Sequence, residues 1–157
     1  MLATVTGISF EFASILLPKI SNNVRIDLMR KMLKKKNWPA DIVDRTDHFI
    51  KSFGTLAENR NLLMHSNMIA GTRETSMLYK TTRQGTTQLC RVSIQELRRV
   101  ADDMVTYFNY GLHLSNMINF ELLTIPPQAG DLVYHAWPDK PPLPNLLEYT
   151  SDPIPVR

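Results

Sequence analysis

The sequence predicts an all-α fold, an antiparallel helical bundle with a short β-hairpin before the last long helix and an irregular, Pro-rich tail. Apolar residues recur at spacings of three and four over most of residues 7–121. Polar, glycine-containing segments separate these stretches. Eight of the ten prolines fall at positions 126–155, where they exclude helix and central strand. We therefore expect a helical domain over residues 1–123 and an extended tail over residues 124–157.

Two helices are expected first, over residues 7–17 and 21–36. In the earlier one, apolar side chains repeat at helical spacing until Pro18 ends the helix. The expected buried side of the later one consists of Val24, Leu28, Met29, Met32 and Leu33. The C-terminal end of this second helix is strongly basic, which suits the helix dipole or a phosphate-contacting surface.

Residues 39–65 continue the helical pattern, as one long helix or as two. An apolar face steps by three and four through Ile42, Thr46, Phe49, Phe53, Leu56, Arg60 and Leu63. Gly54 marks either a bend or a place where another helix approaches closely. An arginine on an apolar face needs an ion partner, a wet cleft or a subunit interface, because burying an unpaired charge is prohibitively costly.

A loop over residues 66–76 and a hairpin centred on Gln84 and Gly85 come next. This hairpin would place Met77 and Tyr79 opposite Val92 and Cys90 on one face, and Leu78, Lys80, Leu89 and Arg91 on the other.

The last long helix is expected over residues 93–120. Ser93 and Glu96 form a capping box at its start, and a regular apolar face follows. In the tail beyond it, Tyr134, Trp137 and the pair Leu146 and Leu147 are the expected anchors on the domain.

Chemically useful side chains gather at Arg60, Asn61 and His65. The guanidinium is a permanent cation that suits phosphate oxygens, and histidine exchanges protons near neutrality. On an ideal helix Asn61 and His65 lie about 40° apart, whereas Arg60 and His65 diverge by about 140°. One straight helix therefore cannot direct both at one atom. Either the helix ends near His65, or a second subunit completes the site across a two-fold axis.

Arg60 followed by Asn61, with His65 five positions after the arginine, resembles the R-x(4–6)-H signature of the HEPN superfamily. The resemblance covers residues 7–121. It implies an all-helical, usually dimeric domain, and many members are metal-independent endoribonucleases. If the roles of the family motif are carried over to this sequence, Arg60 would bind phosphate, Asn61 would be the polar neighbour and His65 would be the acid/base. The function expected is cleavage of RNA by 2′-hydroxyl attack, leaving a 2′,3′-cyclic phosphate.

Two alternatives stay open beside this enzyme. One is a catalytically inactive module of the same kind, used for dimerisation, partner-protein binding or RNA binding. In the other, Arg60 pairs with Glu58, Asp102 or Asp103, and His65 only caps a helix C-terminus.

Charge supports an anionic partner modestly. The chain carries a net charge of +3, and with two Lys and Arg against four Asp and Glu in residues 124–157, the body is basic and the tail acidic. The candidate RNA-binding cations are Arg30, Lys31, Lys34, Lys35, Arg73, Lys80 and Arg83.

Other classes of site are not indicated. His48, His113 and His135 show no metal-ligand spacing, so neither a metal nor another cofactor is expected. His48 is expected to be solvated on a helix surface. A single cysteine, Cys90, suits a reducing cytoplasmic location. No apolar run is long enough to span a membrane. The expected partners are RNA, a second copy of the chain, and a partner or inhibitor protein, but not DNA, which lacks the 2′-hydroxyl.

Overall fold

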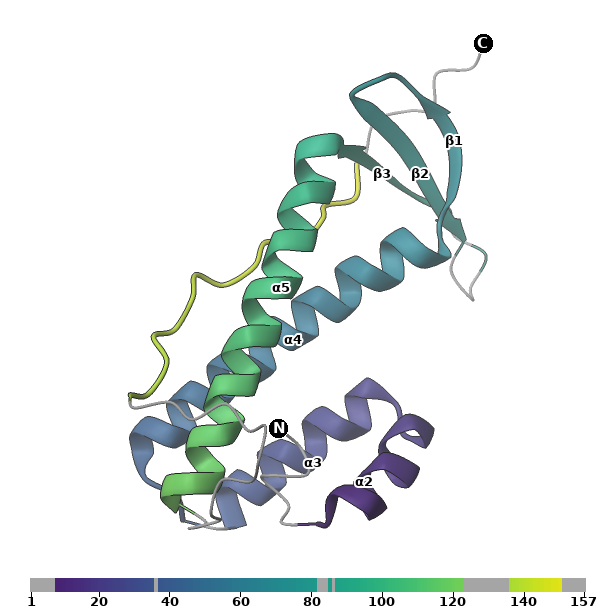
Figure 1. Cartoon of the computed structure of the whole chain (residues 1–157). Helices are drawn as coiled ribbons and strands as arrows, with labels where there is room; N and C mark the ends of the chain where they lie inside the picture. Colours follow the sequence, from purple (N-terminus) through teal and green to yellow (C-terminus); the bar gives the residue numbers. More distant parts are fainter. Residues whose placement is uncertain (1–7, 36, 82–84, 86, 123–135, 151–157) are drawn as a thin grey trace. The chain divides into compact units, whose positions relative to one another are not determined.

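The computed structural model describes residues 8–35, 37–81, 85, 87–122 and 136–150. Within them it contains four α-helices and a three-stranded antiparallel sheet (Figure 1). The helices are α2 (Phe10–Leu16), α3 (Asn22–Lys35), α4 (Ala40–His65) and α5 (Ile94–Met117). The strands are β1 (Asn67–Gly71), β2 (Thr75–Thr81) and β3 (Thr87–Ser93). The all-α prediction is therefore wrong: the fold is mixed α and β.

The chain divides into two compact units. The first unit comprises Met1–Ser52 and Thr106–Leu143, and the second comprises Phe53–Val105 and Pro144–Arg157. Each unit thus contains part of α4 and part of α5, and each is described separately below.

In the first unit, α3 and the beginning of α4 form a hydrophobic core. Met29, Leu33 and Ile50 are buried there, and five partly buried side chains pack on them: Leu17, Ile20, Ile26, Met32 and Trp38. Val24 and Leu28 were expected on the same side of α3 but are 46% and 36% exposed. The buried face of α3 is therefore narrower than its sequence pattern indicates.

Helix α4 is a single helix of 26 residues, which decides between the one-helix and two-helix alternatives. It passes through Gly54 without a break, and a Cβ built there would meet no heavy atom within 4 Å. The close approach considered at Gly54 does not occur among the described residues. It occurs at Gly111 of α5 instead, where a Cβ would collide with the Phe49 ring of α4.

The sheet in the second unit has the order β1-β2-β3. The expected hairpin is present, but its register differs by one residue: Leu78 pairs with Cys90 and Met77 with Arg91. A one-residue change reverses which side chains share a face. Leu78, rather than Met77, therefore lies with Cys90 on the face that packs against the helices. Gly85 lies between the strands with φ +82°, a conformation that glycine adopts without strain.

The predicted loop over residues 66–76 is largely strand. β1 pairs antiparallel with β2, with an irregularity between Met68 and Ala70, and only three residues connect the two strands. Thr72 stabilises this tight turn, since its hydroxyl accepts the backbone N–H groups of Glu74 and Thr75.

The core of the second unit joins the sheet to both helices. Its buried members are Leu62, Cys90, Val92, Val100 and Leu147. Leu147 belongs to the tail, which is extended over the described residues 136–150 and forms a single bridge, Thr150 to Leu89 of β3. Of the expected tail anchors, Leu147 is 2% exposed and Trp137 is half-buried, whereas Leu146 is exposed. Tyr134 lies outside the described residues.

Candidate functional site

The Arg60, Asn61 and His65 side chains all lie on the last two turns of α4, in the second unit. Helix α4 ends at His65, which is one of the two geometries expected from the motif. All three side chains are exposed to solvent. The Arg60 guanidinium donates a long hydrogen bond, 3.4 Å, to the Asn61 side-chain oxygen.

Arg60 does not continue the buried face of α4, as the sequence pattern had suggested. The side chains buried in this turn are Asn59, at 0% exposure, and Leu62, at 4%. The buried face therefore shifts by one residue past Leu56, and Arg60 moves into solvent. An exposed guanidinium keeps its hydration, so it needs no compensating partner.

The ion pairs that would make Arg60 a purely structural residue are not found in the described part of the chain. Glu58 and Asp102 form no ion pair with it, and Asp103 lies 3.9 Å from Arg99 instead. The Arg60 guanidinium is thus open to an external anion.

The role of Asn59 was not predicted from the sequence. Its side-chain amide donates to the backbone carbonyl of Asn145 at 2.9 Å and accepts the backbone N–H of Leu147 at 2.8 Å. One side chain thereby reproduces the pair of bonds that a neighbouring strand would make. Arg99 adds a third bond, to the same Asn145 carbonyl at 3.1 Å. The sequence did contain a signal for this role: Asn59 is a polar residue on the apolar face of the helix, three positions from both Leu56 and Leu62.

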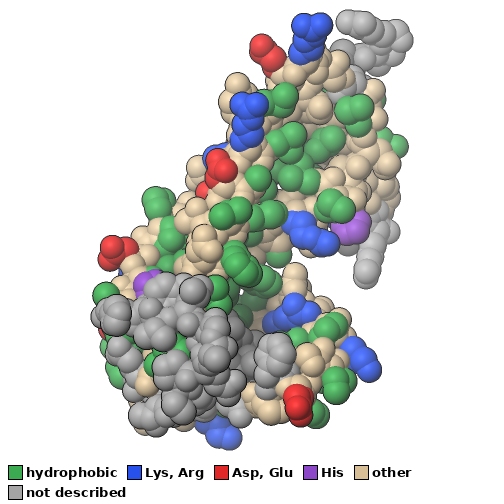
Figure 2. All heavy atoms as spheres, viewed as in Figure 1, with side chains coloured by type: hydrophobic (Ala, Val, Ile, Leu, Met, Phe, Trp, Pro, Cys, Tyr) green, Lys and Arg blue, Asp and Glu red, His purple; other side chains and the backbone are tan. Residues whose placement is uncertain are grey.

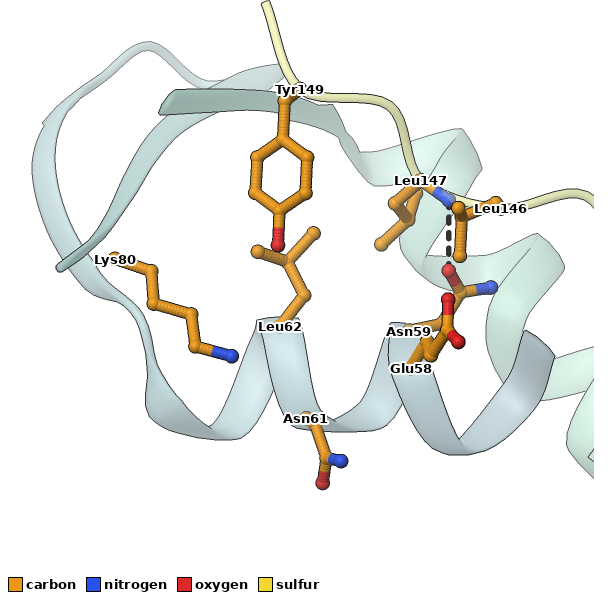
Figure 3. A pocket seen from close by; sticks show the side chains of 8 residues that line it. All are labelled: Glu58, Asn59, Asn61, Leu62, Lys80, Leu146, Leu147 and Tyr149. Atoms are coloured by element: carbon orange, nitrogen blue, oxygen red, sulfur yellow. Dashed lines mark hydrogen bonds between the residues drawn. The ribbon is translucent and has the colours of Figure 1, made fainter. Parts of the chain in front are cut away.

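A hollow of about 210 Å³ lies beside this contact (Figure 3). Helix α4, strand β2 and the tail supply its lining: Glu58, Asn59, Asn61, Leu62, Lys80, Leu146, Leu147 and Tyr149. Figure 3 shows the Tyr149 ring extending from the tail toward Leu62, with Lys80 on one side of Leu62 and Glu58 on the other. Asn61 belongs both to this hollow and to the Arg60 hydrogen bond.

The predicted RNA-binding cations are dispersed. Arg30, Lys31, Lys34 and Lys35 lie on α3 in the first unit, and Lys31 pairs with Asp27 at 2.6 Å. Arg73 is exposed in the turn between β1 and β2. Arg83 lies outside the described residues. Figure 2 shows Lys and Arg side chains on this face as single groups among hydrophobic and neutral surroundings. Of the described members of this set, Lys80 alone lines the hollow.

Two titratable groups near the sheet have displaced pKa values. Burial raises the pKa of the Cys90 thiol, so this cysteine is a weak nucleophile. At the start of α5, hydrogen bonds from the Ser93 backbone and side chain lower the pKa of Glu96. The distances confirm the predicted capping box: Glu96 Oε2 lies 2.7 Å from the Ser93 nitrogen, and the Glu96 nitrogen lies 3.1 Å from the Ser93 hydroxyl.

Within the described ranges, no three His, Cys, Asp or Glu side chains are grouped as a metal site. In the same part of the chain, no helix combines the length and apolar character needed to cross a membrane. No family model, curated protein or solved structure matches the chain.

Proposed function

We propose that the chain is a metal-independent endoribonuclease of the HEPN type that acts as a symmetric homodimer. The observation that carries this proposal is the exposure of Arg60, Asn61 and His65 together at the end of α4, with no carboxylate paired to Arg60 among the described residues. Solvent exposure leaves them available to a substrate.

The chemistry follows from the two ionisable groups. The 2′-hydroxyl oxygen attacks the adjacent phosphorus, the bond from phosphorus to the 5′-oxygen breaks, and the products are a 2′,3′-cyclic phosphate and a 5′-hydroxyl. A His65 imidazole accepts the proton of the attacking hydroxyl, and a second imidazole returns one to the leaving oxygen. Arg60 stabilises the charge on the non-bridging phosphate oxygens.

A second copy is required because this reaction needs both a base and an acid, and each chain supplies one His65. Because Arg60 and His65 diverge around α4, a second copy would also bring one chain's guanidinium beside the other chain's imidazole. Exposed apolar side chains lie close to His65 in the sequence: Met64 at 65%, Met68 at 69% and Ile69 at 43%. A two-fold contact through these side chains would cover them and bring two motifs together. A cytoplasmic location, where RNA is at hand, accords with the one cysteine being a buried thiol.

The test is cleavage of total RNA in excess EDTA by wild-type protein and by His65→Ala and Arg60→Ala. Loss of general acid–base catalysis should slow cleavage by about 10²- to 10⁴-fold, and loss of the cation by about 10²- to 10³-fold. The control variants are His113→Ala and Arg98→Ala, which change the same residue types on a different helix, α5. Both should cleave like wild type.

Equal cleavage by all five proteins would identify a contaminating nuclease and overturn the proposal, as would the absence of cleavage in any of them. In the latter case, a change from dimer to monomer in Arg60→Ala, measured by size-exclusion chromatography with light scattering, would assign the surface to assembly instead.

A further inference from the structure

The hollow beside the motif has the size and lining of a site for one planar group. Its volume of about 210 Å³ is below the range of roughly 300–1,000 Å³ typical of sites that enclose a whole ligand. Three leucines, Leu62, Leu146 and Leu147, supply apolar walls, and Asn61 and Glu58 supply polar groups. Such a lining suits the flat, partly polar body of a nucleobase.

The charges in the hollow argue against a phosphate inside it. Glu58 contributes a carboxylate, which repels an anion, and lies on the other side of Leu62 from Lys80 in Figure 3. The Glu58 end therefore suits hydrogen-bond donors, such as the exocyclic amino groups of bases. The Lys80 end suits the negatively charged backbone.

Tyr149 is held in a position where a base can stack on it. Two residues before it, the buried Leu147 is hydrogen-bonded to Asn59, and one residue after it, the Thr150 N–H donates to the Leu89 carbonyl at 2.8 Å. Anchored on both sides, the ring still remains 45% exposed. A fixed, exposed aromatic ring loses little entropy when a base stacks on it.

Lys80 is directed into the hollow by the register of the sheet. It lies two residues from Leu78, so the two side chains share a face, and Leu78 packs on the core of the second unit. Among the described residues, no carboxylate forms an ion pair with Lys80. Its ammonium group is therefore available to a phosphate at the mouth of the hollow.

We infer that this hollow binds one unpaired base of an RNA strand, with Tyr149 as the stacking surface and Lys80 holding a flanking phosphate. The inference rests on the proposed function and deepens it, because Asn61 connects the hollow to Arg60. A base held here would position its neighbouring phosphodiester beside the motif, so the substrate would be single-stranded.

The test is binding of a short, fully 2′-O-methylated single-stranded oligonucleotide, which cannot undergo 2′-hydroxyl attack, measured by fluorescence anisotropy. Tyr149→Leu should weaken binding by about 5- to 150-fold, the loss of one stacked base, whereas Tyr149→Phe should remain within about twofold of wild type. Phe108→Leu, at another exposed aromatic residue, should have no effect. Lys80→Gln should reduce the slope of log affinity against log salt by about 0.7, and Lys19→Gln should not.

Equal affinity in wild type and Tyr149→Leu would overturn the inference, even if RNA cleavage still depends on Arg60 and His65. Binding that depends on the Tyr149 ring, without any RNA cleavage, would support base binding in the hollow and would contradict the ribonuclease proposal. Preference for the same sequence as a duplex would also overturn the inference, because a paired base cannot enter. Far-ultraviolet circular dichroism of each variant establishes that it is folded.

Discussion

The two units hold the same tail by different chemistry, and the proline positions explain the difference. In the first unit, the hydrogen bonds of the described tail backbone are ones in which it accepts. The carbonyl of Pro138 is bonded by Arg45, that of Pro141 by His48 at 2.8 Å, and those of Pro141 and Pro142 by Tyr107. In the second unit, residues 145–150 contain no proline, and Asn59 both donates to and accepts from the backbone there.

Proline has no N–H group, so Pro138, Pro141 and Pro142 can offer only their backbone carbonyls to hydrogen bonds. Donor side chains from α4 and α5 therefore meet it in the first unit. Over residues 145–150, which contain no proline, one amide can make the paired bonds of a strand. His48 was expected to be solvated, and that prediction is wrong: it is half-buried and bonded to the tail. Since a carbonyl only accepts, Nε2 of His48 carries the proton.

The largest stability effect should come from breaking the second-unit contact. Asn59→Ala removes one buried and one partly buried hydrogen bond and leaves the Leu147 N–H unsatisfied, so the free energy of unfolding should fall by about 3 kcal/mol. Urea unfolding followed by circular dichroism measures it. Asn109→Ala, at an exposed position on α5, is the control. Equal midpoints for the two variants would show that the amide does not hold the tail.

A pair of helical glycines compares the two units directly. Gly111→Ala in the first unit places a Cβ against the Phe49 ring, and should destabilise by about 1–2 kcal/mol after the gain in helix propensity. Gly54→Ala in the second unit meets nothing within 4 Å and should stabilise by about 1 kcal/mol. Thermal unfolding of both variants checks the opposite signs. A stabilising Gly111→Ala would contradict the close packing of Phe49.

The sequence pattern predicted the elements whose signals are local. The last helix and its capping box were predicted from Ser93 and Glu96, because those residues contact each other. The hairpin was predicted from Gly85, but its register was not, since register depends on which face the helices cover. Strand β1 was missed because Asn67–Gly71 is short and bordered by polar residues.

The sequence pattern could not predict contacts between residues that lie far apart in the sequence. Asn59 lies 86 positions before Asn145, and no local rule connects them. The motif's position at the end of a helix was among the predicted geometries, whereas the exposure of Arg60 was not. Its exposure depends on Asn59 taking the buried position.

The tail contact in the first unit should be less sensitive to any single substitution, because several donor side chains share it. Tyr107→Phe removes a hydroxyl that lies 3.0 Å from the Pro141 carbonyl and 2.9 Å from that of Pro142, but His48 still bonds the former. The free energy of unfolding should fall by about 1 kcal/mol, measured by urea titration. A decrease in the free energy of unfolding as large as that of Asn59→Ala would contradict this difference between the two units.

The smallest effect should appear at the start of α5 and should depend on pH. Bonds from Ser93 hold the pKa of Glu96 below its ordinary value of 4.5. Because the folded-state pKa is the lower one, this stabilisation is complete above pH 4.5 and is lost as the pH falls through the folded value. Glu96→Gln should cost about 0.5–1 kcal/mol at pH 7, and the difference from wild type should shrink in acid. Urea midpoints at a series of pH values measure it, and a difference that grows on acidification would contradict the ionised capping box.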